Sequence, residues 1–249
     1  MLFMYSSMIS VNEILFILRF ITGFCILFYA SYTDIKTRRA PNILWLIMGC
    51  LGVIFLLVQV VFTPSLLKTN LFDFIFIPIM IGLMYLFFQL RLIFGGADAK
   101  ALMALAVLVP FPLAFSMVPL YESILPTSWV VFANSVILFL FIPLGLFLFN
   151  VLIKRSIGFP YVFLGYQMPV EQAKKKFVWP LEKIVEGKRK FVYYPSTFDD
   201  PKIWKQFEEQ NIKDVWVTPK IPFMIPLLAG FICTFFIGDI LVGIMQIFL

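Results

Sequence analysis

The sequence predicts an all-α polytopic membrane protein with six transmembrane helices and a small α+β cytoplasmic domain between helices five and six. Two observations lead to this prediction. Of the 249 residues, 61% are hydrophobic and only 14% are charged, which is more apolar surface than a soluble domain can bury. The apolar residues also gather in runs of about 20, the length at which a helix crosses the hydrocarbon core of a bilayer.

Six such runs follow one another along the chain. They occupy residues 14–33, 43–62, 74–93, 99–118, 130–153 and 221–248. The first is expected to be a retained helix, because no basic segment precedes it and no small-residue cleavage site accompanies it, as a signal peptide would require. The fourth is expected to be short, because Pro110 and Pro112 should kink or end its helix.

These runs divide the chain into three parts. Residues 1–153 hold helices one to five and two aspartate-containing loops, residues 154–220 form the soluble domain, and residues 221–249 hold helix six. Within the soluble domain the residue pattern predicts a polar helix at 169–176, a β-hairpin at 183–195 turning at Glu186 and Gly187, a second helix at 199–210 and a strand at 214–219. The charges of this domain are expected to form a solvated face, with substrate docking or a partner site as the alternative.

The basic residues indicate the orientation in the membrane. Eighteen of the 20 Lys and Arg residues lie in the loop after the first run, around the start of the fourth run, or in 154–220. Such segments face the cytoplasm, so both termini are expected outside. The net charge of +6 follows from this distribution, and because no nucleic-acid-binding motif accompanies it, no nucleic acid partner is expected.

Missing residue types narrow the chemistry. The chain has no histidine, which excludes Ser-His and Cys-His nucleophiles and the H-E-x-x-H zinc site. Its three cysteines, Cys25, Cys50 and Cys233, are dispersed in apolar runs and are interpreted as core residues, with no disulfide or metal site. There is no Walker A loop and no G-x-G-x-x-G element. Carboxylates therefore remain as the acid–base groups.

Two aspartates stand at the cytoplasmic ends of spans. Asp34 follows the first run and Asp98 precedes the fourth, so both are expected at a similar depth. Each alone is explained as an ordinary boundary charge, but an ionisable pair at such a place is a candidate functional site. Gly95 and Gly96 lie beside Asp98 and leave room for the close approach of a helix or an extended peptide. This combination favours a protease.

The residues around both aspartates resemble a known family. The segment GGADAK (95–100) resembles the G-x-G-D-x-K motif of the type IV prepilin peptidase family, and DIKTRRAPN (34–42) resembles the loop with that family's other aspartate. Ala97 departs from the motif, since the family has its second glycine there. Six spans with a soluble domain before the last are similar to the archaeal preflagellin peptidases in particular.

The resemblance implies an aspartic endopeptidase of the cell membrane. It would remove the short basic leader peptide from preflagellin or prepilin-like precursors at the cytoplasmic face, without a cofactor or metal. The catalytic residues would be Asp34 and Asp98. The matching residues beside them are Gly95, Gly96, Ala97 and Lys100, expected at the substrate, and Pro41 and Asn42, expected at the start of helix two.

Two of these residues have simpler interpretations. Asn42 can cap helix two with its side chain. Lys100 either extends toward the membrane interface or tunes the charge of Asp98.

The two carboxyl groups are expected to share one proton. Two neighbouring carboxylates do not readily both ionise, so one would activate water and the other would protonate the peptide oxygen. Asp98 at a helix N-terminus is favoured as the carboxylate and Asp34 at a helix C-terminus as the acid, by about 0.3 to 1 kcal/mol each. The helix dipoles therefore predict Asp98 as base and Asp34 as acid.

Two other classes of protein remain as alternatives. A secondary transporter or channel also places acids in a membrane, although its site is expected at the midplane and not at one edge. A non-catalytic membrane scaffold of a surface filament would be indifferent to isosteric change at the aspartates.

Two further expectations concern residues outside the motifs. Arg19 in helix one and Asp239 in helix six are both expected well inside the outer surface, where charges in lipid usually pair, so an interhelical salt bridge is predicted. The cytoplasmic segments lack cysteine and histidine, so the zinc-binding cysteine arrangement of relatives that also methylate the new N-terminus is not possible. A metal-independent peptidase with a single activity is expected.

Overall fold

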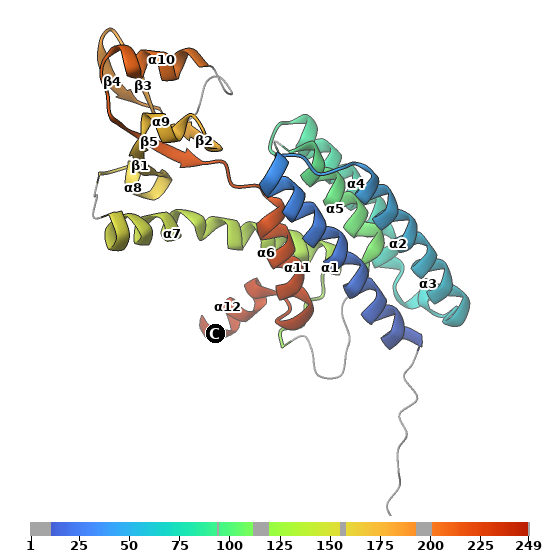
Figure 1. Cartoon of the computed structure of the whole chain (residues 1–249). Helices are drawn as coiled ribbons and strands as arrows, with labels where there is room; N and C mark the ends of the chain where they lie inside the picture. Colours follow the sequence, from blue (N-terminus) through green and yellow to red (C-terminus); the bar gives the residue numbers. More distant parts are fainter. Residues whose placement is uncertain (1–10, 94, 112–119, 155–157, 193–200, 249) are drawn as a thin grey trace, which may run out of the picture. The chain divides into compact units, whose positions relative to one another are not determined.

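The computed structural model describes residues 11–93, 95–111, 120–154, 158–192 and 201–248, and the chain is mostly helical (Figure 1). It forms two compact units. The first, here called the helical unit, comprises Met1–Phe139 and Pro222–Leu249. The second, called the α/β unit, comprises Leu140–Ile221.

The helical unit contains eight helices in the part that the structure describes. They are α1 (Val11–Thr37), α2 (Ile43–Phe62), α3 (Leu66–Thr69), α4 (Leu71–Gln89), α5 (Gly96–Leu108), α6 (Thr127–Leu140), α11 (Met224–Phe236) and α12 (Ile240–Phe248).

Four helical stretches among the described residues are long and apolar enough to cross a membrane. They are Val11–Thr37, Ile43–Phe62, Leu71–Gln89 and Thr127–Ile153. These stretches correspond to the first, second, third and fifth of the six predicted spans. The structure therefore supports a polytopic helical protein, while two predicted spans take a different form.

The fourth predicted span is represented by α5, which has 13 residues. The helix ends at Leu108, just before the proline-containing segment that was expected to stop it, and this part of the prediction is confirmed. Residues 112–118 of the predicted span lie outside the described residues.

The sixth predicted span is interrupted. The break between α11 and α12 contains Gly238, whose φ of 94° is accessible to glycine and rare for other residues. Asp239 follows, and one of its carboxyl oxygens accepts hydrogen bonds from the backbone N–H groups of Leu241 and Val242 at 3.0 and 3.4 Å. The prediction of one continuous helix over 221–248 is wrong, because an aspartate that caps a helix N-terminus starts a new helix there.

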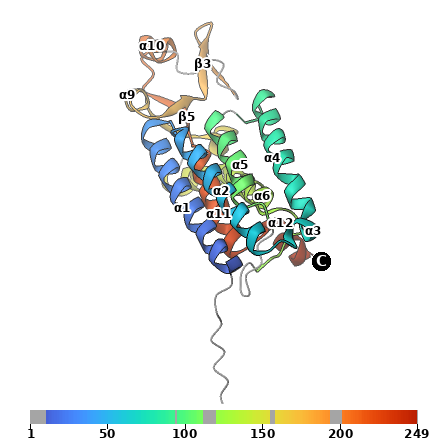
Figure 2. The ribbon, with the colours of Figure 1, turned by 90° about the vertical axis from the view of Figure 1, so that its right-hand side faces the viewer.

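Small residues set the packing around α5. This helix packs against α2 and α4, and its buried face includes Ala99, Ala101 and Ala104 (Figure 2). On α2, a Cβ atom at Gly52 would lie 2.9 Å from the backbone of Leu108, a distance that no real side chain tolerates. The α2 and α5 backbones are therefore in direct contact, as is usual for membrane helices that meet through small residues.

Aromatic rings and one hydrogen bond join α1 to α11. The rings of Phe20 and Phe231 are stacked with centroids 5.9 Å apart, and those of Phe16 and Phe235 meet at 5.2 Å. The Ser31 hydroxyl donates to the backbone carbonyl of Met224 at 2.9 Å, which gives this buried hydroxyl a partner.

The predicted salt bridge between Arg19 and Asp239 is not formed. Arg19 donates to the Gln59 side-chain oxygen on α2 at 2.9 Å. Asp239 accepts from the Ser123 hydroxyl at 2.8 Å in addition to capping α12. The prediction is wrong because each charged group is hydrogen-bonded to other residues: Arg19 to Gln59, and Asp239 to Ser123 and the backbone of α12.

The α/β unit begins with helix and continues with strands and short helices. Its elements are α7 (Ile142–Phe149), a π-helical turn η1 (Asn150–Lys154), α8 (Tyr161–Leu164), β1 (Tyr166–Pro169), α9 (Val170–Ala173), β2 (Val178–Pro180), β3 (Glu182–Val185), β4 (Lys188–Phe191), α10 (Pro201–Glu209) and β5 (Asp214–Pro219). Strands β1, β5 and β2 form an antiparallel sheet in that order, and β3 pairs with β4. A small core around Phe207, Val215 and Val217 lies against the sheet.

The types of element predicted for this region are confirmed where the structure describes them, although the helix predicted at 169–176 is shorter, and residues 193–195 of the hairpin and 199–200 of the second helix lie outside the described residues. The hairpin turns at Glu186 and Gly187, whose φ values of 53° and 75° are those of the tight turn that suits a two-residue hairpin loop. The predicted strand at 214–219 is β5, and the two predicted helices contain α9 and α10.

Candidate active site

Asp34 lies in the last turn of α1, which ends at Thr37. The chain leaves the helix through Arg38, whose φ of 57° is left-handed, and the Arg38 N–H donates to the Asp34 carbonyl at 3.0 Å. This is a common way to end a helix, although glycine usually occupies the left-handed position. The turn brings the chain through Pro41 and Asn42 directly into α2.

Asp98 is the third residue of α5, and its carboxyl group folds back over Gly95. Gly95 is the residue that precedes the helix, with an extended backbone at φ −89° and ψ 111°. A Cβ atom added to Gly95 would lie 2.0 Å from Oδ2 of Asp98 and 2.7 Å from its carboxyl carbon. Gly95 therefore makes the space that the Asp98 carboxyl group occupies.

Gly96 has a different environment. A Cβ atom there would lie 3.4 Å from the ring of Phe88, which is ordinary van der Waals contact. The sequence predicts one shared role for the two glycines, the close approach of another backbone. In the structure the two glycines have different roles, because the position of the Asp98 carboxyl group requires glycine at Gly95 and not at Gly96.

The two aspartates are at the same end of the helical unit. The C-terminal end of α1 and the N-terminal end of α5 lie together there, and the two helices contact each other (Figures 1 and 2). Asp98 precedes the apolar stretch that begins at Ala99. Burial, followed by the negative charge of Asp34, raises the pKa of Asp98 to about 7. The two carboxyl groups are thus near enough to influence each other.

A hydrogen bond joins the two motifs independently of the aspartates. Lys100 Nζ donates to Asn42 Oδ1 at 2.9 Å, which links the first turns of α5 to the start of α2. The Asn42 side chain makes no capping bond to α2, so the expected capping role is wrong. The Asn42 amide oxygen accepts from Lys100 instead, and a hydrogen bond from a charged donor is stronger than one from a neutral backbone N–H group.

The remaining predicted residues have local roles. The Pro41 carbonyl accepts from the Leu44 N–H at 3.2 Å in the first turn of α2. Ala97 packs against the core of the helical unit from the first turn of α5. Both residues thereby shape the segments that carry Asn42 and Asp98.

Trp45 is a residue that sequence reasoning did not select. It lies three residues after Asn42 on α2, is 5% exposed, and its indole N–H has no acceptor within the described ranges. A buried indole usually has a hydrogen-bond partner. Its sequence context, an unbroken apolar helix, offers no signal that distinguishes it from a core residue.

No metal centre accompanies the aspartates in the part of the chain that the structure describes. No group of three or more His, Cys, Asp or Glu side chains is arranged there to hold an ion. The described groups at this end of the helical unit include two carboxyl groups, the Arg38 guanidinium, the Lys100 amine and the Asn42 amide.

The fold is that of a helical membrane protein, and two aspartates form a candidate acid–base site at one end of its helical unit. Comparison with known proteins gives this class a family. The profile of the "Type IV leader peptidase family" matches residues 21–149, which include both aspartate motifs, and that of "Archaeal Peptidase A24 C-terminus Type II" matches residues 158–240. The chain belongs to the type IV leader peptidase family and is a protease.

Individual relatives cover nearly the full chain. A preflagellin peptidase of Methanococcus voltae is 34% identical over 88% of this chain and 94% of its own length. Preflagellin peptidases of Methanococcus maripaludis and Methanocaldococcus jannaschii are each 28% identical, over 89% and 91% of this chain and 96% and 97% of their own lengths. The transporter and scaffold alternatives are not favoured by these similarities.

Proposed function

We propose that the protein is an aspartic endopeptidase that removes the leader peptide from preflagellin-like precursors, with Asp34 and Asp98 as its catalytic pair. The observation that carries this proposal is the electrostatic coupling of the two carboxyl groups, because the charge of Asp34 contributes to the raised pKa of Asp98. The names of the relatives support preflagellin as the substrate class.

The mechanism requires one proton on the carboxyl pair. The ionised carboxylate takes a proton from a water molecule, and the water oxygen attacks the scissile carbonyl carbon. The protonated carboxyl group donates its proton to the carbonyl oxygen as the tetrahedral intermediate forms. Collapse of the intermediate then breaks the C–N bond, and the amine departs with a proton returned by the pair.

We assign the resting proton to Asp98 and the role of base to Asp34. This reverses the assignment from helix dipoles. A dipole effect of about 0.3 to 1 kcal/mol corresponds to less than about one pKa unit. Burial and the neighbouring charge raise the pKa of Asp98 from 3.8 to about 7, which is a larger change in the opposite direction.

The rate of cleavage is expected to follow a bell-shaped pH profile. Asp98 must hold a proton, so kcat/KM should fall as the pH rises through about 7. The rate should also fall in acid, where Asp34 becomes protonated and no base remains. The dependence of kcat/KM on pH is measured in detergent, with a peptide that contains the cleavage site of the precursor as substrate. Rates that keep rising well above neutral pH would contradict the assignment of Asp98 as the acid.

The Lys100–Asn42 hydrogen bond is expected to fix the position of the Asp98 segment relative to the segment that carries Asp34. Lys100→Met should lower kcat about 10-fold with little change in KM, because small misplacement of reacting groups slows chemistry. Lys100→Arg should restore part of the rate. Lys174→Met, at an exposed lysine of the α/β unit that pairs with Glu208, is the matched control and should leave the rate unchanged. Equal rates in the Lys100→Met variant and the wild type would contradict a positioning role for the Lys100–Asn42 hydrogen bond.

We also propose an orientation in the bilayer. The aspartate end of the helical unit and residues 154–220 would face the cytoplasm, with both termini outside, in accordance with the distribution of basic residues. A basic leader would not be attracted by this basic surface. The hydrophobic segment that follows the leader would therefore provide most of the binding energy by docking between helices.

The direct test is incubation of the purified protein in detergent with a preflagellin precursor, followed by mass spectrometry of the product. The expected product lacks the leader and carries an unmodified N-terminal amine. An intact precursor would contradict the proposed function. The same leader fused to a soluble carrier should be cleaved poorly, and efficient cleavage of that fusion would show that helix docking is unnecessary.

A further inference from the structure

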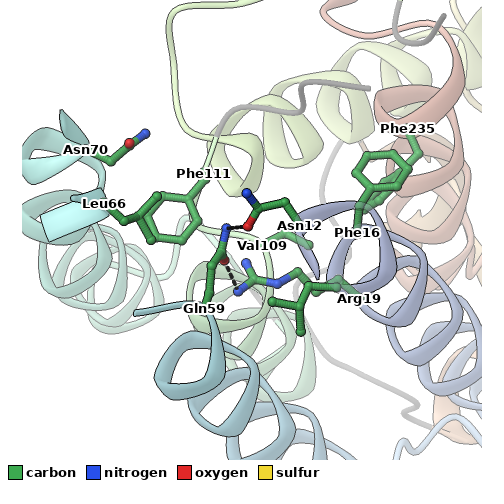
Figure 3. Close-up of a pocket in the computed structure, with 10 residues that line it drawn as sticks. Asn12, Phe16, Arg19, Gln59, Leu66, Asn70, Val109, Phe111 and Phe235 are labelled. Atoms are coloured by element: carbon green, nitrogen blue, oxygen red, sulfur yellow. Dashed lines mark hydrogen bonds between the residues drawn. The ribbon is translucent and has the colours of Figure 1, made fainter. Parts of the chain in front are cut away.

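A cavity of about 230 Å³ lies in the helical unit away from the aspartates (Figure 3). Its lining includes Asn12, Phe16 and Arg19 of α1, Gln59 of α2 and Phe111 after α5. Arg19 precedes Asp34 by 15 residues on the same helix, which corresponds to about 22 Å along its axis. The cavity is therefore a feature separate from the proposed active site.

Arg19 is a buried charge whose partners among the described residues are all neutral. Its side chain is 6% exposed, and Nη2 donates to Gln59 Oε1 at 2.9 Å. The guanidinium carbon lies 5.6 Å from the centre of the Phe111 ring, while Nε is buried without an acceptor among the described residues. Gln59 is in turn held by Asn12, whose Oδ1 accepts at 3.3 Å, so Gln59 is oriented with its oxygen toward the arginine (Figure 3).

No carboxylate neutralises this guanidinium within the described part of the chain. The ion pairs found there, Lys174–Glu208 and Arg189–Glu182, are both in the α/β unit. A buried charge is costly unless an opposite charge accompanies it. A guanidinium offers five N–H donors in a planar fork. Gln59 is the one side-chain acceptor of Arg19 among the described residues, which leaves most of these donors for a ligand.

A phosphate group fits these features. Its oxygens can accept two parallel N–H bonds from an arginine and supply the missing negative charge. The cavity holds several times the roughly 30 Å³ that one water molecule occupies in the liquid, so a phosphate group can enter. It is smaller than the roughly 300 to 1,000 Å³ of pockets that enclose drug-sized ligands, so lipid chains would stay outside.

The surroundings favour a lipid as the source of the phosphate. Phe16 and Phe111 give the cavity apolar walls. Near Gln59, at the end of α2, Val61 and Phe62 are 73% and 65% exposed, as expected of side chains that face lipid. We propose that this cavity binds the phosphate of a phospholipid headgroup through Arg19, with the lipid chains lying along the apolar surface of the helices.

The test measures the melting temperature of the full-length protein in a neutral detergent with three additives. Phosphatidylglycerol should raise the Tm by about 5 °C when it is well above its dissociation constant. Diacylglycerol with the same chains, which lacks the phosphate, should have no such effect. Inorganic phosphate distinguishes a lipid headgroup from free phosphate as the ligand. If it raises the Tm as much as phosphatidylglycerol does, the cavity is a site for free phosphate and the lipid assignment is overturned.

Two variants separate ligand binding from general stability. Gln59→Glu is nearly isosteric and would place a carboxylate at the oxygen that already contacts Arg19. It should raise the Tm without lipid and abolish the response to phosphatidylglycerol. Arg19→Met should lose the response by removing the cation. The proposal is overturned if the wild type responds equally to diacylglycerol, responds to none of the additives, or keeps its response in the folded Gln59→Glu variant.

Discussion

Replacement of either Asp34 or Asp98 by asparagine is expected to lower the rate of leader cleavage at least about 1,000-fold. Asparagine keeps the shape of the side chain but can neither take up nor release the shared proton. Loss of a general acid or base typically costs about 10²- to 10⁴-fold, and here each substitution disables the pair as a whole. Single-turnover cleavage of a preflagellin precursor, followed by mass spectrometry, measures the effect.

A matched control is available in α4. Asp73 is also a buried acid, 5% exposed, and accepts a hydrogen bond from the Asn70 side chain at 3.0 Å. Asp73→Asn should leave the rate within about twofold of the wild type, because Asp73 has no part in the proposed proton transfer. Circular dichroism and gel filtration of all three variants show whether they are folded. Substantial cleavage by a folded Asp34→Asn or Asp98→Asn protein would exclude the proposed pair.

Gly95→Ala and Gly96→Ala are expected to differ by about 100-fold in kcat. At Gly95 the new methyl group would overlap the Asp98 carboxyl group, which would have to rotate out of the space over Gly95. At Gly96 the methyl group would meet the Phe88 ring at an ordinary contact distance, and alanine suits the first turn of a helix. Gly95→Ala should therefore be nearly inactive and Gly96→Ala close to the wild type.

The same pair of variants reports on the geometry of the site. In Gly95→Ala the Asp98 carboxyl group would be displaced, so its pKa should move from about 7 toward the ordinary value for aspartic acid. Infrared titration of the carboxyl band measures this change. Similar activity in the two alanine variants would show that the carboxyl group does not depend on the space at Gly95.

The sequence predicted features that depend on local pattern. Span boundaries placed Asp34 and Asp98 at one end of the helices, since helix ends follow the limits of apolar runs. The hairpin turn at Glu186 and Gly187 was equally predictable, because few residues accept its backbone angles.

Features that depend on side-chain competition were not predictable. Asn42 has the residue type of a helix cap, but Lys100 occupies its oxygen. Arg19 and Asp239 have opposite charges, but each is engaged by a neutral group from another segment. The difference between Gly95 and Gly96 depends on the rotamer of Asp98, about which residue spacing carries no information.

The contact between Gly52 and the backbone of Leu108 fixes the distance between α2 and α5 near one end of α5, and the Lys100–Asn42 bond joins the two helices near the other. A helix attached at both ends and packed without intervening side chains cannot slide or tilt without losing contact along its length. We therefore expect the two helices to move as one body, with Asp98 at a constant height relative to α2.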